Sequence, residues 1–359
     1  MTVRSFAKIN LGLRIGARRE DGFHNLLTVY QTIALHDVVR VRVVRGSGIE
    51  IRCDDSRVPK DESNTCFQIV DKAMQAFGAK GRVIIEIEKR LPVQGGLGGA
   101  SSNAIAALLG LERAVKKKLP ATEKLRLAAA VGSDLPLFLL GGTVLGLGRG
   151  EQVYPLPDLP ATLCVIVTPE VGVSTPKAFA DWDKMCGAGA HAREVSPNVS
   201  AGPHPAGQPR AAVPTQLEPI HMPRRTPGIA AKLTLPAPSD RMNELSRGIS
   251  AWLSEVYTGA PFGRGRAENP LLELVRAGID NDFEQVVFPE YPELREAKRA
   301  LVCAGAKYAS LSGSGSTLYG FFVRGQTAAS AAAKLKKQGW AAQASIMLSR
   351  GQYWSKIFA

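Results

Sequence analysis

A glycine-rich loop is the part of this 359-residue sequence whose residue types point most directly to chemistry. Residues 92–102 read Pro-Val-Gln-Gly-Gly-Leu-Gly-Gly-Ala-Ser-Ser, and good helix formers follow at 103–109. Glycines let the backbone approach a ligand, and amides at a helix N-terminus bind anions. A tight turn needs only about two residues. The longer loop therefore predicts a phosphate site, with Ser101 or Ser102 capping the helix. It has neither the Walker A ending nor the Rossmann fingerprint.

Two charged residues suit the transfer of a phosphoryl group. Asp134 precedes the apolar run Leu-Pro-Leu-Phe, where a carboxylate can orient or deprotonate an attacking hydroxyl. Taken alone, such an aspartate is more often a helix cap. Lys8 lies in an apolar, strand-like run, and a period of two places Asn10 on the same face. The pair can point into a cleft, or Lys8 can be a solvated lysine on the outer face of the strand.

Two further short segments suggest ligand contacts. In Arg19–His24 an Asp-Gly turn presents Phe23 and His24 side by side, as a base-stacking site requires. Residues 311–317 form a second small, hydroxyl-rich loop, which could equally be an ordinary turn. No metal ligand is expected, because the histidines and cysteines lack ligand-like spacing.

The composition favours anionic partners without choosing among them. With 45 basic and 32 acidic residues, the formal charge is +13, which fits nucleic acid, acidic lipid or phosphorylated metabolites. No apolar run approaches the roughly 18 residues of a membrane span, and the N-terminus lacks a signal-peptide pattern. Five scattered cysteines predict reduced thiols and a cytoplasmic protein.

The chain reads as two α+β domains, at 1–157 and 158–359. Between about 186 and 238 lie ten of the 23 prolines and no periodicity, so we expect a mobile insertion there. Strands are expected at 39–43, 83–87, 161–168, 317–323 and 341–348, and helices at 64–77, 243–257, 268–279, 292–304 and 327–338.

Taken together, these motifs identify a family. The loop at 92–102 resembles the ATP-binding loop of the GHMP kinases, which are named for galactokinase, homoserine kinase, mevalonate kinase and phosphomevalonate kinase. Within the family the sequence is similar to the branch that phosphorylates 4-diphosphocytidyl-2-C-methyl-D-erythritol in the non-mevalonate isoprenoid route. The supporting blocks occur in family order: Ala7–Leu11, Arg19–His24, Gly132–Phe138, Asn281–Glu284 and Ser312–Ser316.

The resemblance implies an ATP-dependent small-molecule kinase with an alcohol acceptor. Its fold would combine a β-α-β N-terminal domain with a ferredoxin-like α/β sandwich, and the active site would lie in the cleft between them. Lys8 and Asp134 match the catalytic pair, and Mg²⁺ is expected with ATP. Substrate contacts are expected from Asn10, Phe23, His24, Thr175 and Phe179, and ATP contacts from Pro92, Val93, Gln94, Gly95, Gly96, Leu97, Gly98, Gly99, Ala100, Ser101 and Ser102.

The sequence departs from the family pattern at three places. Phe23 replaces the usual tyrosine, so stacking is retained but a hydroxyl is lost. Ala100 replaces a glycine, which requires a negative φ. The insertion leaves the alignment near Phe179 open.

Two other functions remain open at this stage. One is a different GHMP kinase, of the mevalonate or homoserine type. The other is a basic nucleic-acid-binding protein. The kinase interpretation expects small-molecule partners, no nucleic acid, no membrane, and a monomer or weak homodimer.

Overall fold

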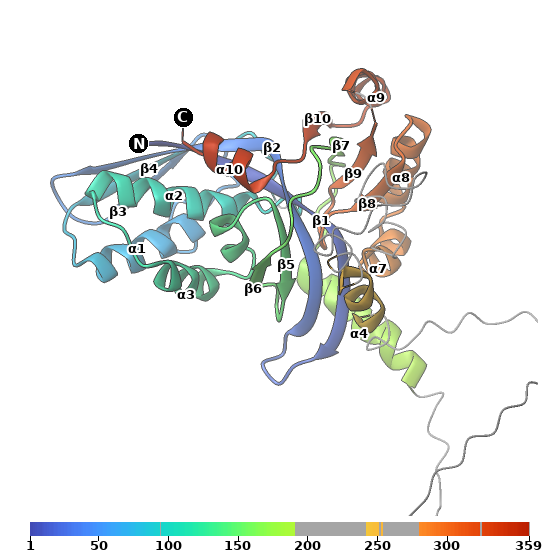
Figure 1. Ribbon diagram of the computed structural model, residues 1–359, viewed down its shortest axis with the longest axis horizontal. Helices are drawn as coiled ribbons and strands as arrows, with labels where there is room; N and C mark the ends of the chain where they lie inside the picture. Colours follow the sequence, from blue (N-terminus) through green and yellow to red (C-terminus); the bar gives the residue numbers. More distant parts are fainter. Residues whose placement is uncertain (94, 191–241, 251–252, 254–279, 324, 359) are drawn as a thin grey trace, which may run out of the picture.

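Two β-sheets, each covered by helices, make up the described part of the chain (Figure 1). The computed structural model describes residues 1–93, 95–190, 242–250, 253, 280–323 and 325–358. The two halves lie side by side, and the long strands β1 (Thr2–Arg18) and β2 (His24–Val44) run from the first half toward the second. This is the two-domain α+β fold that the family resemblance implied.

The first sheet contains six of the described strands, in the order β3-β4-β2-β5-β6 with β1 paired to β2. Its pairs are antiparallel except for β3 and β4. The alternation predicted for 39–43 is present, because Val39 and Val41 are buried while Arg40 is exposed. The remaining strands are β3 (Ile49–Cys53), β4 (Arg82–Glu88), β5 (Thr143–Leu147) and β6 (Gln152–Pro155).

Helices cover one face of this sheet. Residues 65–77 form α1 (Thr65–Phe77), which buries Ile69, Val70 and Ala73 at helical spacing, as the sequence predicts. The other helices of this half are α2 (Gly99–Val115), α3 (Ala121–Val131) and the short 3₁₀ helix η1 (Pro136–Leu139). The sequence analysis did not identify α3.

The second sheet is antiparallel, in the order β10-β7-β9-β8. Its elements follow the β-α-β-β-α-β pattern of ferredoxin-like domains. The strands are β7 (Leu163–Val167), β8 (Tyr308–Leu311), β9 (Leu318–Phe322) and β10 (Ala342–Ile346), and the helices are α4 (Thr175–Ala190), α7 (Glu284–Glu290), α8 (Pro292–Cys303) and α9 (Gly325–Lys337).

The chain then returns to the first half. Helix α10 (Arg350–Lys356) buries Tyr353, whose hydroxyl donates to the carbonyl of Phe138 at 2.7 Å. The last helix therefore packs on the N-terminal half, although the predicted boundary at 157/158 assigns it to the C-terminal domain.

The expected insertion needs one correction. We placed its start at about 186, but α4 continues to Ala190, so its first residues are helical. Residues 191–238 and the predicted helix at 268–279 lie outside the described residues. Of the predicted helix at 243–257, residues 243–250 and 253 are described and are helical.

A buried ion pair joins the two halves. Arg14 on β1 contacts Asp282 at 2.9 Å, and both side chains are at most 5% exposed. The other Asp282 oxygen accepts from the amide of Ile15 at 2.9 Å, and backbone bonds between Leu13 and both 280 and 282 extend the junction. No helix among the described residues is long and apolar enough to cross a membrane.

We predict that Asp282→Ala destabilises the fold by about 3–5 kcal/mol, because it removes the buried carboxylate that lies 2.9 Å from the buried Arg14 guanidinium. Asp280 is the matched control. It lies 3.6 Å from Arg14 but its side chain is 70% exposed, so Asp280→Ala should cost less than about 1 kcal/mol. Urea denaturation of both variants measures the difference, and equal losses would contradict the role given to Asp282.

Candidate active site

A pocket of about 910 Å³ lies against the glycine loop. Its walls come from two groups of residues. The glycine-loop side consists of the loop, the start of α1 and Lys89, and the β2–α4 side consists of Phe23, His24, segment 172–176 and Phe179. Lys8, Asn10 and Asp134 line the same pocket. The sequence-predicted catalytic, substrate and loop residues thus meet around one space, except Gln94, which lies outside the described residues, and Ser102, which is buried beside Phe6.

The glycine loop leads directly into α2. Gly98 precedes the helix with φ 68°, and no side chain caps the first turn. The predicted serine cap is therefore wrong. The helix begins at Gly99, so Ser102 lies inside its first turn and its hydroxyl donates to the carbonyl of Phe6 at 2.7 Å. Ala100 is helical and is not among the described positive-φ residues, so alanine can replace the family's glycine at this position without backbone strain.

A second loop, at residues 311–317, fixes the position of the glycine loop. The hydroxyl of Ser312 donates to the carbonyl of Gly96 at 3.1 Å, and the Thr317 amide donates to the carbonyl of Gly95. Gly96 has φ 80°, and a Cβ there would lie 2.3 Å from the Ser312 carbonyl oxygen. The side-chain amide of Asn281 donates to the carbonyls of Leu311 and Gly313. The loop at 311–317 is therefore a support for the glycine loop.

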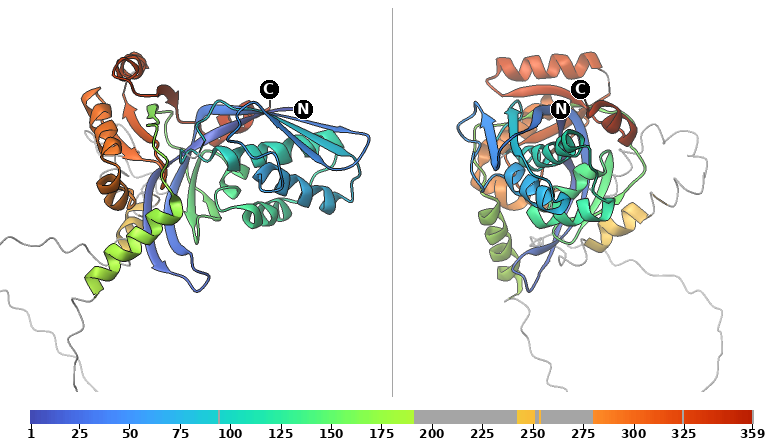
Figure 2. Two further views of the ribbon diagram at one scale, coloured as in Figure 1. Left: turned by 180° about the vertical axis from the view of Figure 1, so that it is seen from behind. Right: turned by 90° about the vertical axis from the view of Figure 1, so that its left-hand side faces the viewer.

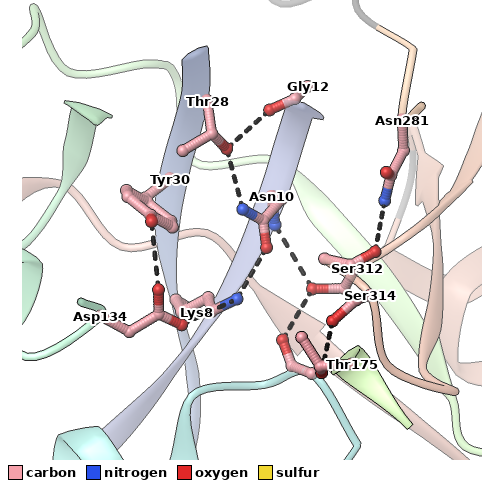
Figure 3. Close-up of polar contacts among 12 residues, drawn as sticks. Lys8, Asn10, Gly12, Thr28, Tyr30, Asp134, Thr175, Asn281, Ser312 and Ser314 are labelled. Atoms are coloured by element: carbon pink, nitrogen blue, oxygen red, sulfur yellow. Dashed lines mark hydrogen bonds and ion pairs between the residues drawn. The ribbon is translucent and has the colours of Figure 1, made fainter. Parts of the chain in front are cut away.

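Lys8 and Asp134, which both line the pocket, form an ion pair (Figure 3). The Lys8 ammonium lies 3.3 Å from Asp134 Oδ2 and 2.7 Å from Asn10 Oδ1. Lys8 is 3% exposed, so it is not the solvated lysine of the alternative interpretation. Asp134 caps no described helix, and its side chain remains 32% exposed. The side-chain amide of Asn10 on β1 donates to the Thr28 hydroxyl on β2, which fixes Asn10 beside Lys8.

The sequence analysis missed Tyr30, which completes this cluster. Its hydroxyl donates to Asp134 Oδ1 at 3.1 Å. Burial, followed by the nearby charge of Asp134, raises the pKa of Tyr30 well above its usual value. Tyr30 is therefore a hydrogen-bond donor to one Asp134 oxygen, Oδ1, while the other oxygen, Oδ2, faces Lys8.

Aromatic rings line the β2–α4 side. His24 is buried, its Nε2 lies 2.7 Å from Asp183, and its ring stacks on Phe179 with centroids 4.9 Å apart and planes 9° apart. Phe23 is 51% exposed and lies beneath the Arg149 guanidinium. The hydroxyl of Thr175 contacts Ser314 at 2.7 Å, which connects α4 to the second loop.

Other pocket residues carried no sequence signal. Lys89 is held by Asp37 at 2.6 Å, and Asn64 caps α1. Asn103 is 3% exposed, and its Oδ1 has no hydrogen-bond partner among the described residues. The described part of the chain holds no group of three or more His, Cys, Asp or Glu residues that could bind a metal ion.

Comparison with known proteins agrees with this geometry. The family model described as "GHMP kinases N terminal domain" matches residues 64–142, and "GHMP kinases C terminal" matches residues 267–340. The chain belongs to the GHMP kinase family.

The particular relatives are 4-diphosphocytidyl-2-C-methyl-D-erythritol kinases. The one from Heliobacterium modesticaldum is 34% identical over 96% of this chain and 93% of its own. The one from Solibacter usitatus is 32% identical over 89% and 80%. A crystal structure of 4-(cytidine 5'-diphospho)-2C-methyl-D-erythritol kinase superposes with a TM-score of 0.63 at 28% identity, covering 97% of this chain and 99% of that one. The Methanococcus jannaschii mevalonate kinase, at 11% identity, a TM-score of 0.60 and coverage of 97% and 98%, shares the fold.

We predict that Gly96→Ala weakens the binding of a non-hydrolysable ATP analogue at least about tenfold. A side chain at this φ is strained, and its Cβ would displace the second loop. Gly351→Ala is the control, because Gly351 lies in α10, outside the pocket lining, and its Cβ would meet only the Ser349 hydroxyl at 4.0 Å. Isothermal titration calorimetry measures both, and unchanged binding in Gly96→Ala would show that the loop contact is dispensable.

Proposed function

We propose that the protein transfers the γ-phosphate of ATP to the 2-hydroxyl of 4-diphosphocytidyl-2-C-methyl-D-erythritol, a step of the non-mevalonate isoprenoid route. The observation that carries this is the Lys8–Asp134 pair, which lies in one pocket with a phosphate-type loop and with the stacked pair His24 and Phe179. The family relationship supports the same activity.

ATP is proposed to bind on the glycine-loop side. Its phosphates would contact the backbone of residues 95–99 and the first turn of α2, where anions are favoured. The unpaired Oδ1 of Asn103 offers a buried acceptor to a nucleotide amine or hydroxyl. Burying that oxygen without a partner would cost about 1–3 kcal/mol, which a bound nucleotide can recover.

The cytidyl group is proposed to bind on the β2–α4 side. Phe23 is half exposed and offers a ring face, which contributes about 1–3 kcal/mol per stacked base. His24 is fixed by Asp183 and can bond to the edge of the cytosine. Phe179, which the family resemblance implies as a substrate contact, stacks on His24, so its proposed role is to support that ring.

The chemistry follows from the central cluster. Asp134 accepts the proton of the attacking hydroxyl while that oxygen forms a bond to the γ-phosphorus. The bond from this phosphorus to the β–γ bridging oxygen breaks, and ADP leaves. Lys8 stabilises the developing negative charge. Tyr30 and Asn10 orient the pair, because each holds one of its members by a hydrogen bond.

Mg²⁺ is proposed to arrive with ATP. The ion prefers oxygen ligands and commonly keeps phosphates and waters with only one or two protein groups. The pocket wall offers the Ser101 hydroxyl, an oxygen ligand that fits that chemistry, and the described residues offer no cluster that would form a closed metal cage. When bound, Mg²⁺ would neutralise phosphate charge.

From the sequence we also propose a domain boundary at 157/158, a cytoplasmic location, and a monomer or weak homodimer. A mevalonate or homoserine substrate has no chemical use for the ring stack around His24, and a nucleic-acid-binding function has no support from the family relationship.

We predict that Asp134→Asn lowers kcat by about 10²–10⁴-fold, the usual size of a general-base contribution. ATP-analogue binding should change little, because the loop contacts are backbone groups elsewhere. Asp71→Asn is the control, since Asp71 bonds only to the exposed Gln75 among the contacts described. A coupled assay of ADP release checks this, and turnover within a few-fold of the parent would remove Asp134 from the mechanism.

A further inference from the structure

Arg149 is a positively charged residue of the pocket wall that belongs neither to the glycine loop nor to the cluster around Asp134. It lies in the turn between β5 and β6, which Gly148 and Gly150 form with φ values of 70° and 100°. Its guanidinium carbon is 5.0 Å from the centroid of the Phe23 ring, and its side chain is 31% exposed.

The turn packs against β2, the strand that carries both His24 and Tyr30. The Leu26 amide, two residues after His24, donates to the carbonyl of Gly148 at 2.6 Å. A Cβ on Gly150 would lie 2.3 Å from the Tyr30 hydroxyl, the group that bonds to Asp134. The turn that carries Arg149 therefore contacts β2 near His24, by the proposed base site, and also near Tyr30, which bonds to Asp134.

The charge of Arg149 is the least engaged among the Lys and Arg residues of the pocket walls in the described chain. Its contact with Glu151 is long, at 3.8 Å, and the other Glu151 oxygen accepts from the Arg149 amide at 2.6 Å. The other pocket cations have closer partners: Lys8 with Asn10 at 2.7 Å, Lys89 with Asp37 at 2.6 Å and Arg57 with Asp55 at 2.7 Å.

We propose that Arg149 binds the diphosphate bridge of the substrate and so selects a nucleoside diphosphate over a nucleoside. The inference rests on the proposed function, in which the base lies by Phe23 and the reacting hydroxyl by Asp134. The bridge between those two parts of the substrate is its diphosphate. The planar fork of arginine matches two phosphate oxygens at once, and a half-exposed arginine can turn from Phe23 toward them.

The test compares CDP with cytidine in the full-length protein. Isothermal titration calorimetry is run with a saturating non-hydrolysable ATP analogue, so that neither ligand occupies the glycine-loop side. The unmodified protein should bind CDP more tightly than cytidine. Arg149→Ala should weaken CDP by about 10–100-fold, the range for loss of a charge-assisted hydrogen bond, and change cytidine by less than about twofold.

Two further variants make the comparison specific. Arg149→Lys keeps the charge without the fork and should restore only part of the CDP affinity. Arg126→Ala removes an exposed arginine from α3, outside the pocket, and should change neither ligand. Unchanged cytidine binding also shows that Arg149→Ala leaves the site folded.

Three results would overturn the inference. If Arg149→Ala retains the preference for CDP, the inference fails and the proposed function stands. If Arg149→Ala instead weakens the ATP analogue and spares CDP, Arg149 serves the nucleotide. If the unmodified protein binds neither CDP nor cytidine, the proposed function and the inference fail together.

Discussion

The close approach of two backbone loops is the constraint on which the site depends. Gly315 packs against Gly96 so tightly that a Cβ on Gly315 would lie 2.5 Å from the Gly96 nitrogen. Only glycine permits such proximity. Because one loop precedes α2 in the first half and the other follows β8 in the second, this contact brings the two halves together at the pocket. The loop at 92–102 acquires its shape from residues more than two hundred positions away.

Strand β1 carries this constraint to the proposed catalytic residues. Val3 and Phe6 belong to the core of the first half, while Leu13 and Ile15 belong to the core of the second. Figure 2 shows the long N-terminal strand running from one half toward the other. Lys8 and Asn10 lie between these ends. A buried ammonium is costly unless it has partners. Asn10 and Asp134 supply them here, so the charge is held where phosphoryl transfer would need it.

Local pattern was sufficient to predict the elements with strong periodicity. The α1 helix, the β4 strand and α8 were expected within a few residues of their observed bounds. The seven-residue α10 was missed, because so short a helix shows little periodicity and is stabilised by the packing of Tyr353. The serine cap was wrong because Gly98, with positive φ, starts the helix earlier.

Residues that line the pocket could be named from the sequence, but their pairings could not. Lys8, Asp134 and His24 were named from motifs that lie on different elements, and Phe179 was expected only from the family resemblance. Tyr30 was missed because its partner Asp134 is 104 positions away, and no local signal marks a strand tyrosine as a donor. The stacking of Phe179 on His24 likewise depends on how α4 packs on β2, which single-sequence patterns do not encode.

The most direct test of the proposed function compares two acceptors at equal concentration with ATP. One is 4-diphosphocytidyl-2-C-methyl-D-erythritol, and the other is its fragment 2-C-methyl-D-erythritol 4-phosphate. Phosphorus NMR identifies the product, and ADP release gives kcat/KM. The account predicts phosphorylation at the 2-hydroxyl of the cytidyl compound, with the fragment at least about 100-fold less efficient, because binding of the remote base aids the transition state. Equal efficiency for both acceptors, or no transfer to the cytidyl compound, would contradict it.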